Sequence, residues 1–349
     1  MITSKFGGSS VTPQNFHCLN RLVKNDCCVV VSAVGKEFCN DVKTTDLLTR
    51  YYFGDEQAWE CVCNKFLRLV KVNGVRCDVE RLLFDAKKQS KKSLYYCLSL
   101  GEEITAKIAA CYLNCAYLEA ADLVRFDGSK FCKKATLNNL KSAFCGLKRG
   151  VIGGFYGGFD NDRRVFSRGG GDVTGALCAV ATDSYLYENW TDVNGVCKAN
   201  PKFINGAQTV SQLSYYEMYA LAKGGAEVLH PDAVKIAGEF GVPIVVGNSL
   251  NEFAPTTLIS YCPSRLPFLS VTEKTTAKGI QSTVLHNLSQ QNLAKCLQQV
   301  FHKTQRRRPT CDCAEECPIV TGYSVNSDSV KILSSKSILK ELYEVFGKL

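Results

Sequence analysis

The sequence opens on Met1-Ile2-Thr3-Ser4-Lys5-Phe6-Gly7-Gly8-Ser9-Ser10, a strand-like segment that runs directly into a turn of glycine and serine. An amphipathic helix is predicted near residues 13–24, and a second, apolar strand over residues 26–33. Two strands joined through a helix are typical of the beginning of a parallel sheet. This stretch therefore predicts an α/β fold in which Lys5 and the glycines lie at the carboxyl end of the first strand.

The rest of the chain extends this pattern and then changes it. A mostly helical region is expected over residues 44–117, and the alternation that follows it predicts an α/β sandwich. Its strands are expected at 151–156, 185–190 and 242–246, and its helices after Asp172 and at 212–223 and 231–239. Past residue 262 the order becomes strand, helix, strand, helix, at 267–271, 288–302, 319–325 and 336–346. We therefore predict a catalytic domain over residues 1–262 and a smaller domain over residues 263–349.

The composition is that of a soluble globular protein. Hydrophobic residues make up 46% of the 349 residues, and no run approaches the ~18 consecutive apolar residues of a membrane helix. The first six residues leave no room for the charged and apolar regions of a signal peptide. The net charge of +9 is spread along the chain without a recognisable nucleic-acid-binding module. We therefore expect a cytoplasmic protein that binds neither membranes nor nucleic acid.

Cysteine is unusually frequent, with 19 residues. The number is odd and the cysteines are scattered through predicted helices and strands, which favours reduced thiols over a disulfide framework. Cys311, Cys313 and Cys317 are closely spaced, but no second Cys/His pair follows at the spacing of a zinc site. We therefore predict no metal site there.

Two glycine-rich turns are suited to phosphate chemistry. In the first, backbone N–H groups can approach phosphate oxygens closely, and Lys5 can neutralise charge on a transferred group. The second, Arg168-Gly169-Gly170-Gly171-Asp172, opens a helix and offers a cation for a carboxylate and an acid that could orient a lysine or engage Mg²⁺. Neither turn has the P-loop spacing G-x-x-x-x-G-K-[ST]. Taken alone, the first turn could equally be a tight turn with a helix cap.

Several segments resemble, in order, the aspartate kinase branch of the amino-acid kinase family, and in particular its short-loop bacterial form. They lie at residues 5–11, 31–33, 45–48, 101–102, 154–157, 166–172, 190–196 and 225–231. The resemblance implies a three-layer α/β/α sandwich with a mostly parallel sheet. It also implies that ATP, with Mg²⁺, phosphorylates the side-chain carboxylate of L-aspartate to give 4-phospho-L-aspartate, the entry to lysine, threonine, methionine and diaminopimelate synthesis.

The resemblance further assigns roles to individual residues. Lys5 would stabilise the transferring phosphoryl group, and Asp172 would orient Lys5. Glu102 would hold the aspartate amino group and Arg168 its α-carboxylate, with Ser32 and Thr45 completing the substrate site. The nucleotide would be bound by Lys5, Gly7, Gly8, Ser9, Thr191, Asp192 and Lys202.

Four positions depart from the residues usual in this family. Gly171 stands where serine is usual, Cys197 where an aromatic is, Asn200 where aspartate is, and Glu227 where lysine often is. Two alternatives therefore stay open: a kinase for another amino acid, or a non-catalytic amino-acid sensor or partner subunit.

The C-terminal segment has room for one regulatory module. The family usually carries two ACT modules that bind lysine or threonine, whereas residues 263–349 are long enough for a single or degenerate ACT-like unit. If its sheet edge pairs with that of another protomer, the protein is a homodimer.

Overall fold

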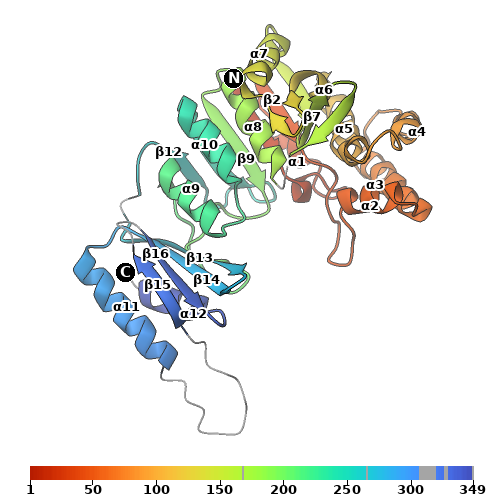
Figure 1. The fold of residues 1–349 in the computed structure, drawn as a ribbon. Helices are drawn as coiled ribbons and strands as arrows, with labels where there is room; N and C mark the ends of the chain where they lie inside the picture. Colours follow the sequence, from red (N-terminus) through yellow and green to blue (C-terminus); the bar gives the residue numbers. More distant parts are fainter. Residues whose placement is uncertain (167–168, 265, 306–319, 326–328, 348–349) are drawn as a thin grey trace. The chain divides into compact units, whose positions relative to one another are not determined.

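The structure is a computed structural model that describes residues 1–349 except 167–168, 265, 306–319, 326–328 and 348–349 (Figure 1). The chain divides into two compact units. The first comprises Met1–Val193 and Asp232–Ala254, and the second comprises Asn194–Pro231 and Pro255–Leu349. Each unit has its own sheet and its own hydrophobic core. In the described part of the chain, no helix combines the length and the apolar character needed to cross a membrane.

The first unit is built on parallel strands in the order β11-β9-β1-β2-β6-β3. Their bounds are β1 Ile2–Phe6, β2 Cys27–Val31, β3 Ala116–Leu118, β6 Arg149–Gly153, β9 Leu186–Thr191 and β11 Ile244–Asn248. β1 lies in the centre, flanked by β2 and β9, and is buried along its whole length. The carboxyl ends of these strands therefore meet at one edge, with the end of β1 at its middle.

Helices cover both faces of this sheet (Figure 1). The helices are α1 Cys18–Leu22, α2 Thr44–Tyr52, α3 Glu56–Asn73, α4 Val79–Gln89, α5 Leu94–Leu113, α6 Ala120–Leu123, α7 Lys133–Phe144, α8 Gly170–Ala181 and α10 Pro231–Phe240. Phe6 and Val31 pair across the strands and belong to the core shared with α2 to α5. Lys5 and Val30 point to the opposite face, which α8 covers. The pleat of β1 thus decides that Lys5 faces α8.

Short hairpins complete the first unit. β4 Phe126–Asp127 pairs with β5 Lys130–Phe131, and β7 Tyr156–Phe159 pairs with β8 Asp162–Val165. The second hairpin packs on α5, and β7 also packs on α6.

The second unit contains a four-stranded antiparallel sheet in the order β13-β14-β16-β15. Its strands are β13 Phe268–Thr276, β14 Gly279–His286, β15 Val320–Val325 and β16 Ser329–Ser334. α11 Gln290–Gln305 and α12 Leu339–Phe346 share a core with one face of this sheet, in which Val271, Val284 and Ile332 are fully buried. The unit also holds the parallel pair β10 Gln212–Ser214 and β12 Thr257–Ser260, and the helix α9 Tyr215–Gly224.

The predicted fold class is confirmed, but two strands of the antiparallel sheet, β14 and β16, were not predicted. The other differences are local. The helix expected at 13–24 is reduced to Cys18–Leu22, because the residues before it form turns that close on the Thr12 carbonyl. The strand expected at 151–156 is two strands, since Phe155 between them has a φ of +75°. The helix expected at 212–223 begins as a strand and starts only at Tyr215, where Ser214 and Glu217 form a capping box.

Candidate functional site

The first glycine-rich turn closes tightly at the carboxyl end of β1. The N–H of Gly7 donates to the Trp190 carbonyl at 3.0 Å, and residues Gly8–Ser10 form a single 3₁₀ turn. A Cβ on Gly35 would lie 2.2 Å from the Gly8 carbonyl oxygen, so this neighbouring loop must carry glycine to approach. Among the described residues the N–H groups of Gly8 and Ser9 have no hydrogen-bond partner. Of the three predicted backbone donors, Gly7 therefore donates within the protein, whereas Gly8 and Ser9 keep N–H groups without an acceptor among the described residues.

Lys5 and Asp172 form the central ion pair of the site. The Lys5 Nζ lies 2.7 Å from the Asp172 Oδ1, and each side chain is about nine-tenths buried. Asp172 lies in the first turn of α8, and Asn189 on β9 donates to the same Oδ1 at 3.1 Å. The structure therefore brings together the two residues predicted as the phosphoryl-stabilising lysine and its orienting acid.

Gly171 and Ser32 lie against this ion pair. A Cβ on Gly171 would be 3.3 Å from the Ser32 Oγ and 3.5 Å from the Lys5 Cε. A Cβ on Gly154 would in turn lie 2.9 Å from the Gly171 Cα. The second glycine-rich turn thus packs directly onto the first strand end, with Ser32 beside it.

Glu102 is a buried carboxyl group on α5. Its exposed fraction is 5%, and its Oε2 has no hydrogen-bond partner among the described residues. Burial raises the pKa of Glu102 to about 8, against the lowering effect of a backbone hydrogen bond at Ala33. A buried carboxyl with an unpaired oxygen is suited to receive a cation such as an ammonium group.

Thr44 and Thr45 begin α2 beside the same strand ends. The Thr44 hydroxyl is buried and donates to the Val34 carbonyl at 2.6 Å, whereas Thr45 is half-buried and bonds through its backbone carbonyl to Thr49. Arg168, predicted to hold the substrate α-carboxylate, lies outside the described residues. The closely spaced Cys311, Cys313 and Cys317 also lie outside them.

The predicted nucleotide residues are divided between the two units. Thr191 ends β9, its hydroxyl donates to Asp192 Oδ1 at 3.1 Å, and its carbonyl accepts from Ser249 at 2.8 Å. Lys202 belongs to the second unit, is exposed, and its backbone N–H donates to Asn200 Oδ1 at 3.0 Å. Its place in a nucleotide site stays a prediction.

A buried charged cluster that sequence reasoning missed supports Glu102. Arg163 on β8 donates to Glu103 at 2.5 Å and to Glu119 at 3.3 Å, and Tyr156 donates to Glu119 at 2.8 Å. Because Glu103 follows Glu102 on α5, this cluster fixes the helix that presents Glu102. Arg163 is 60 positions from Glu103 and 44 positions from Glu119 along the chain, so no local sequence pattern predicts the cluster.

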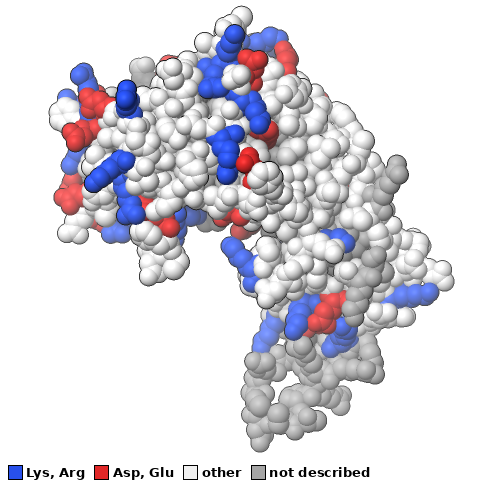
Figure 2. Space-filling model, turned by 180° about the vertical axis from the view of Figure 1, so that it is seen from behind, with Lys and Arg blue, Asp and Glu red and all other residues white. Residues whose placement is uncertain are grey.

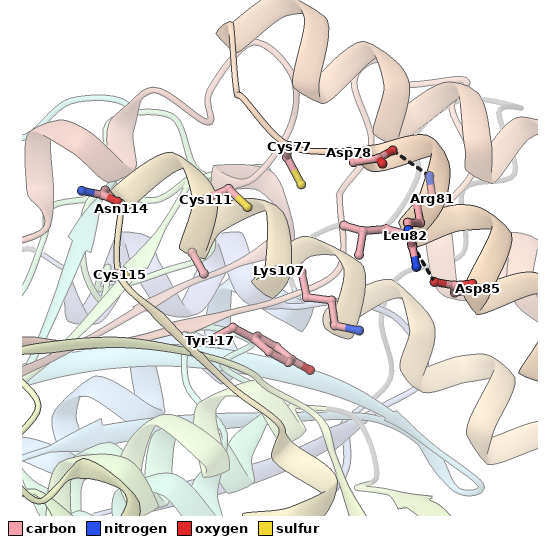
Figure 3. Close-up of a pocket in the computed structure, with 11 residues that line it drawn as sticks. Cys77, Asp78, Arg81, Leu82, Asp85, Lys107, Cys111, Asn114, Cys115 and Tyr117 are labelled. Carbon is pink, nitrogen blue, oxygen red and sulfur yellow. Dashed lines mark hydrogen bonds and ion pairs between the residues drawn. The ribbon is translucent and has the colours of Figure 1, made fainter.

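A separate cavity of about 460 Å³ lies toward the other end of α5 (Figure 3). Cys77 and Cys111 point toward one another in it, with Lys107 and Tyr117 below them in this view. Burial and the neighbouring Cys111 thiol raise the pKa of Cys77 to about 12, which makes it a poor nucleophile at neutral pH. The cavity shares no lining residue with the Lys5 site. All 16 cysteines in the described part of the chain are free thiols.

Figure 2 shows how charged side chains are distributed over one face of the molecule. Basic side chains there are dispersed and lie beside acidic ones. Such a mixed surface is typical of a solvated face.

Known proteins are similar to this chain in sequence and in fold. The sequence model of the amino acid kinase family matches residues 1–248. The chain belongs to the amino acid kinase family. Two curated relatives in this family are Aspartokinase 3 of Bacillus subtilis, 31% identical over 73% of the chain, and the aspartokinase of Geobacillus stearothermophilus, 28% identical over 72%. The alignments cover 62% and 57% of those proteins, so the chain spans about three-fifths of the length of the relatives it matches.

Two solved structures share this fold. Clostridium acetobutylicum aspartate kinase aligns with a TM-score of 0.75 at 26% identity, over all of this chain and 82% of that one. Aspartokinase III of Escherichia coli, solved with aspartate and ADP, aligns with a TM-score of 0.71 at 20% identity, over 99% and 83%. The second likeness shows the fold alone.

Proposed function

We propose that this protein is an aspartate kinase that transfers the γ-phosphate of ATP to the side-chain carboxylate of L-aspartate, giving 4-phospho-L-aspartate. The observation that carries the proposal is the buried Lys5–Asp172 ion pair beside a tight glycine turn, at the end of a central parallel strand. Phosphoryl transfer requires positioning and charge neutralisation more than covalent chemistry. The names of the relatives favour aspartate as the acceptor.

The groups at the end of β1 would stabilise the negative charge of the phosphoryl group. Lys5 would lie against the transferred phosphoryl group, held in position by Asp172 and, through it, by Asn189. The N–H groups of Gly8 and Ser9 would bind phosphate oxygens. These groups stabilise negative charge as it moves from the nucleotide to the acceptor carboxylate.

The acceptor would be held by groups on both sides of the strand ends. The ammonium of aspartate would pair with Glu102, which gains the cation that its unpaired Oε2 lacks. Arg168 would take the α-carboxylate in a bidentate pair, and Ser32 and Thr45 would bind remaining polar atoms.

Mg²⁺ would enter with the nucleotide. The described residues form no group of three or more His, Cys, Asp or Glu that could hold a metal by themselves. Magnesium usually keeps one or two protein oxygens and takes the rest from phosphates and water. Asp192, exposed at the end of β9, could supply one such oxygen. When bound, the ion would neutralise charge on the ATP phosphates.

The proposal also covers the domain division, the regulatory unit and the oligomeric state. We place the division between catalytic and ACT-like parts at residue 262, and assign the four-stranded sheet with α11 and α12 to a single ACT-like unit. A homodimer formed through this unit, in the cytoplasm, completes the proposal.

A coupled assay for aspartate-dependent ADP release tests this function. We expect activity in the wild type, a decrease in kcat of at least about 10²-fold in Lys5→Ala, and no change in Lys71→Ala, which removes an exposed lysine on α3. A protein that releases no ADP in response to aspartate, or a Lys5→Ala variant as active as the wild type, contradicts the proposal. A panel of other amino acids separates aspartate from glutamate as the acceptor.

A non-catalytic sensor is the second candidate, because the family resemblance assigns three altered positions to the nucleotide side. These are Cys197, Asn200 and Glu227. Calorimetry distinguishes the two: a sensor binds aspartate without measurable binding of ATP, whereas the kinase binds both.

A further inference from the structure

One face of the antiparallel sheet in the second unit, the one opposite α11 and α12, carries mostly polar side chains. The register pairs Thr272 with Thr283, and Thr283 with Lys331, so these side chains share one face of β13, β14 and β16. The alternate residues Val271, Val284 and Val330 face the core with α11 and α12. α9 packs on the polar face, where a Cβ on Gly224 would lie only 2.8 Å from the Thr272 Oγ1.

Between α9 and this face lies a cavity of about 400 Å³. Its lining includes three lysines, Lys223 on α9, Lys274 on β13 and Lys331 on β16, and no acidic residue among those described. None of the three lysines forms an ion pair with a described carboxylate. The nearest acid in sequence, Glu273, lies on the other face of β13 and binds Ser282 and Ser337. The cavity therefore concentrates positive charge.

The floor of the cavity contains a polar group that nothing satisfies. Thr283 lines the cavity, its side chain is 2% exposed, and its Oγ1 has no hydrogen-bond partner in the described structure. The hydroxyl of Thr272, opposite Thr283 in the register, is also buried without a partner. A buried hydroxyl without a partner lowers stability, which is tolerated more readily where a ligand can supply the bond.

We propose that this cavity binds a compact dianion, a phosphate group or a small dicarboxylate, between Lys223, Lys274 and Lys331, with the Thr283 hydroxyl donating to it. The volume admits a small metabolite, and three lysine ammonium groups can supply donors for its oxygens. No residue of this cavity belongs to the Lys5–Asp172 site. The proposal is therefore independent of the kinase assignment.

Calorimetric titration with inorganic phosphate and with succinate, at constant ionic strength, tests the site. The titrations are made in the full chain carrying Lys5→Ala, so that phosphate binding at the glycine turn is weakened, and the cavity is identified by the effect of the variants below. We expect saturable binding of at least one probe, weakened about tenfold or more by Lys331→Gln and unchanged by Lys340→Gln, which alters an exposed lysine on α12. Binding of phosphate alone, or of succinate alone, identifies which dianion the site prefers.

The variant Thr283→Val separates a ligand contact from a structural role. Valine keeps the shape of threonine but removes the unpaired hydroxyl, so resistance to urea should stay equal or rise while dianion affinity falls. Absence of binding with both probes, or affinities unchanged in Lys331→Gln and Thr283→Val, overturns the proposal. Neither result bears on aspartate-dependent ADP release, which tests the kinase function separately.

Discussion

Replacing Glu102 with glutamine should make the ligand-free protein more stable at neutral and alkaline pH. Glu102 has its pKa raised from 4.5 to about 8 by burial, so the folded state retains a proton that the unfolded state releases. Below pH 4.5 the carboxyl is protonated in both states and the charge has no effect. As the pH rises from 4.5 to about 8, ionisation of the unfolded state increasingly favours unfolding.

The size of this effect follows from the pKa difference. At about 1.4 kcal/mol per pH unit, the penalty is about 3 kcal/mol at pH 7 and approaches about 5 kcal/mol above pH 8. Glutamine has nearly the same shape and does not titrate, so the stability difference between Glu102→Gln and the wild type should grow over this pH window.

Urea unfolding of both proteins at several pH values between 4.5 and 9 measures the difference directly. Aspartate should reduce it, because its ammonium would pair with the ionised Glu102 and stabilise the wild type alone. A stability difference that stays constant from pH 4.5 to 9 would refute the reasoning, since it would show that Glu102 ionises normally in the folded protein.

Two further changes test the strand-end geometry. Asp172→Asn removes the charge next to a buried lysine. We therefore expect the unfolding free energy to fall by about 3 kcal/mol in denaturant titration, and kcat to fall in the ADP-release assay. Stability and kcat equal to those of the wild type would contradict a role for the ion pair. Gly35→Ala places a Cβ 2.2 Å from the Gly8 carbonyl oxygen, so the glycine turn must shift. We expect the KM for ATP to rise and the unfolding free energy to fall by about 1–3 kcal/mol. An unchanged KM would show that the turn is not held by this contact.

The first unit of the fold could be predicted because its signals are local. The apolar run Cys27–Val31 marked β2, and the glycine turn after Phe6 marked the end of β1. The second glycine turn placed Asp172 at the start of a helix, where it does meet Lys5. The Arg163 cluster could not be predicted, since its charged residues are brought together only by the packing of a hairpin on α5.

The antiparallel sheet was predicted incompletely for a different reason. β16 alternates between buried apolar and exposed polar positions only over Val330–Ile332. In β14 the last five residues are all buried, and Ser282, Thr283 and His286 among them are polar, so no apolar alternation marks this strand in the sequence. Polar residues on the face of the sheet opposite α11 and α12, Thr283 and Lys331 among them, line the lysine-rich cavity. The polar side chains that made these strands difficult to predict from the sequence are therefore the ones from which a second binding site is inferred.

Small residues explain why Glu102 lies buried beside the strand ends. A Cβ on Gly101 would lie 2.8 Å from the Ala33 Cβ, and one on Gly153 would lie 3.2 Å from the Glu102 carbonyl oxygen. α5 can therefore approach the ends of β2 and β6 more closely than a larger side chain at either position would allow. That close approach removes water from the Glu102 carboxyl and raises its pKa, and it also brings the carboxyl to the edge of the sheet where Lys5 ends β1. The same packing thus produces both the unfavourable burial and the placement that an incoming ammonium group would use.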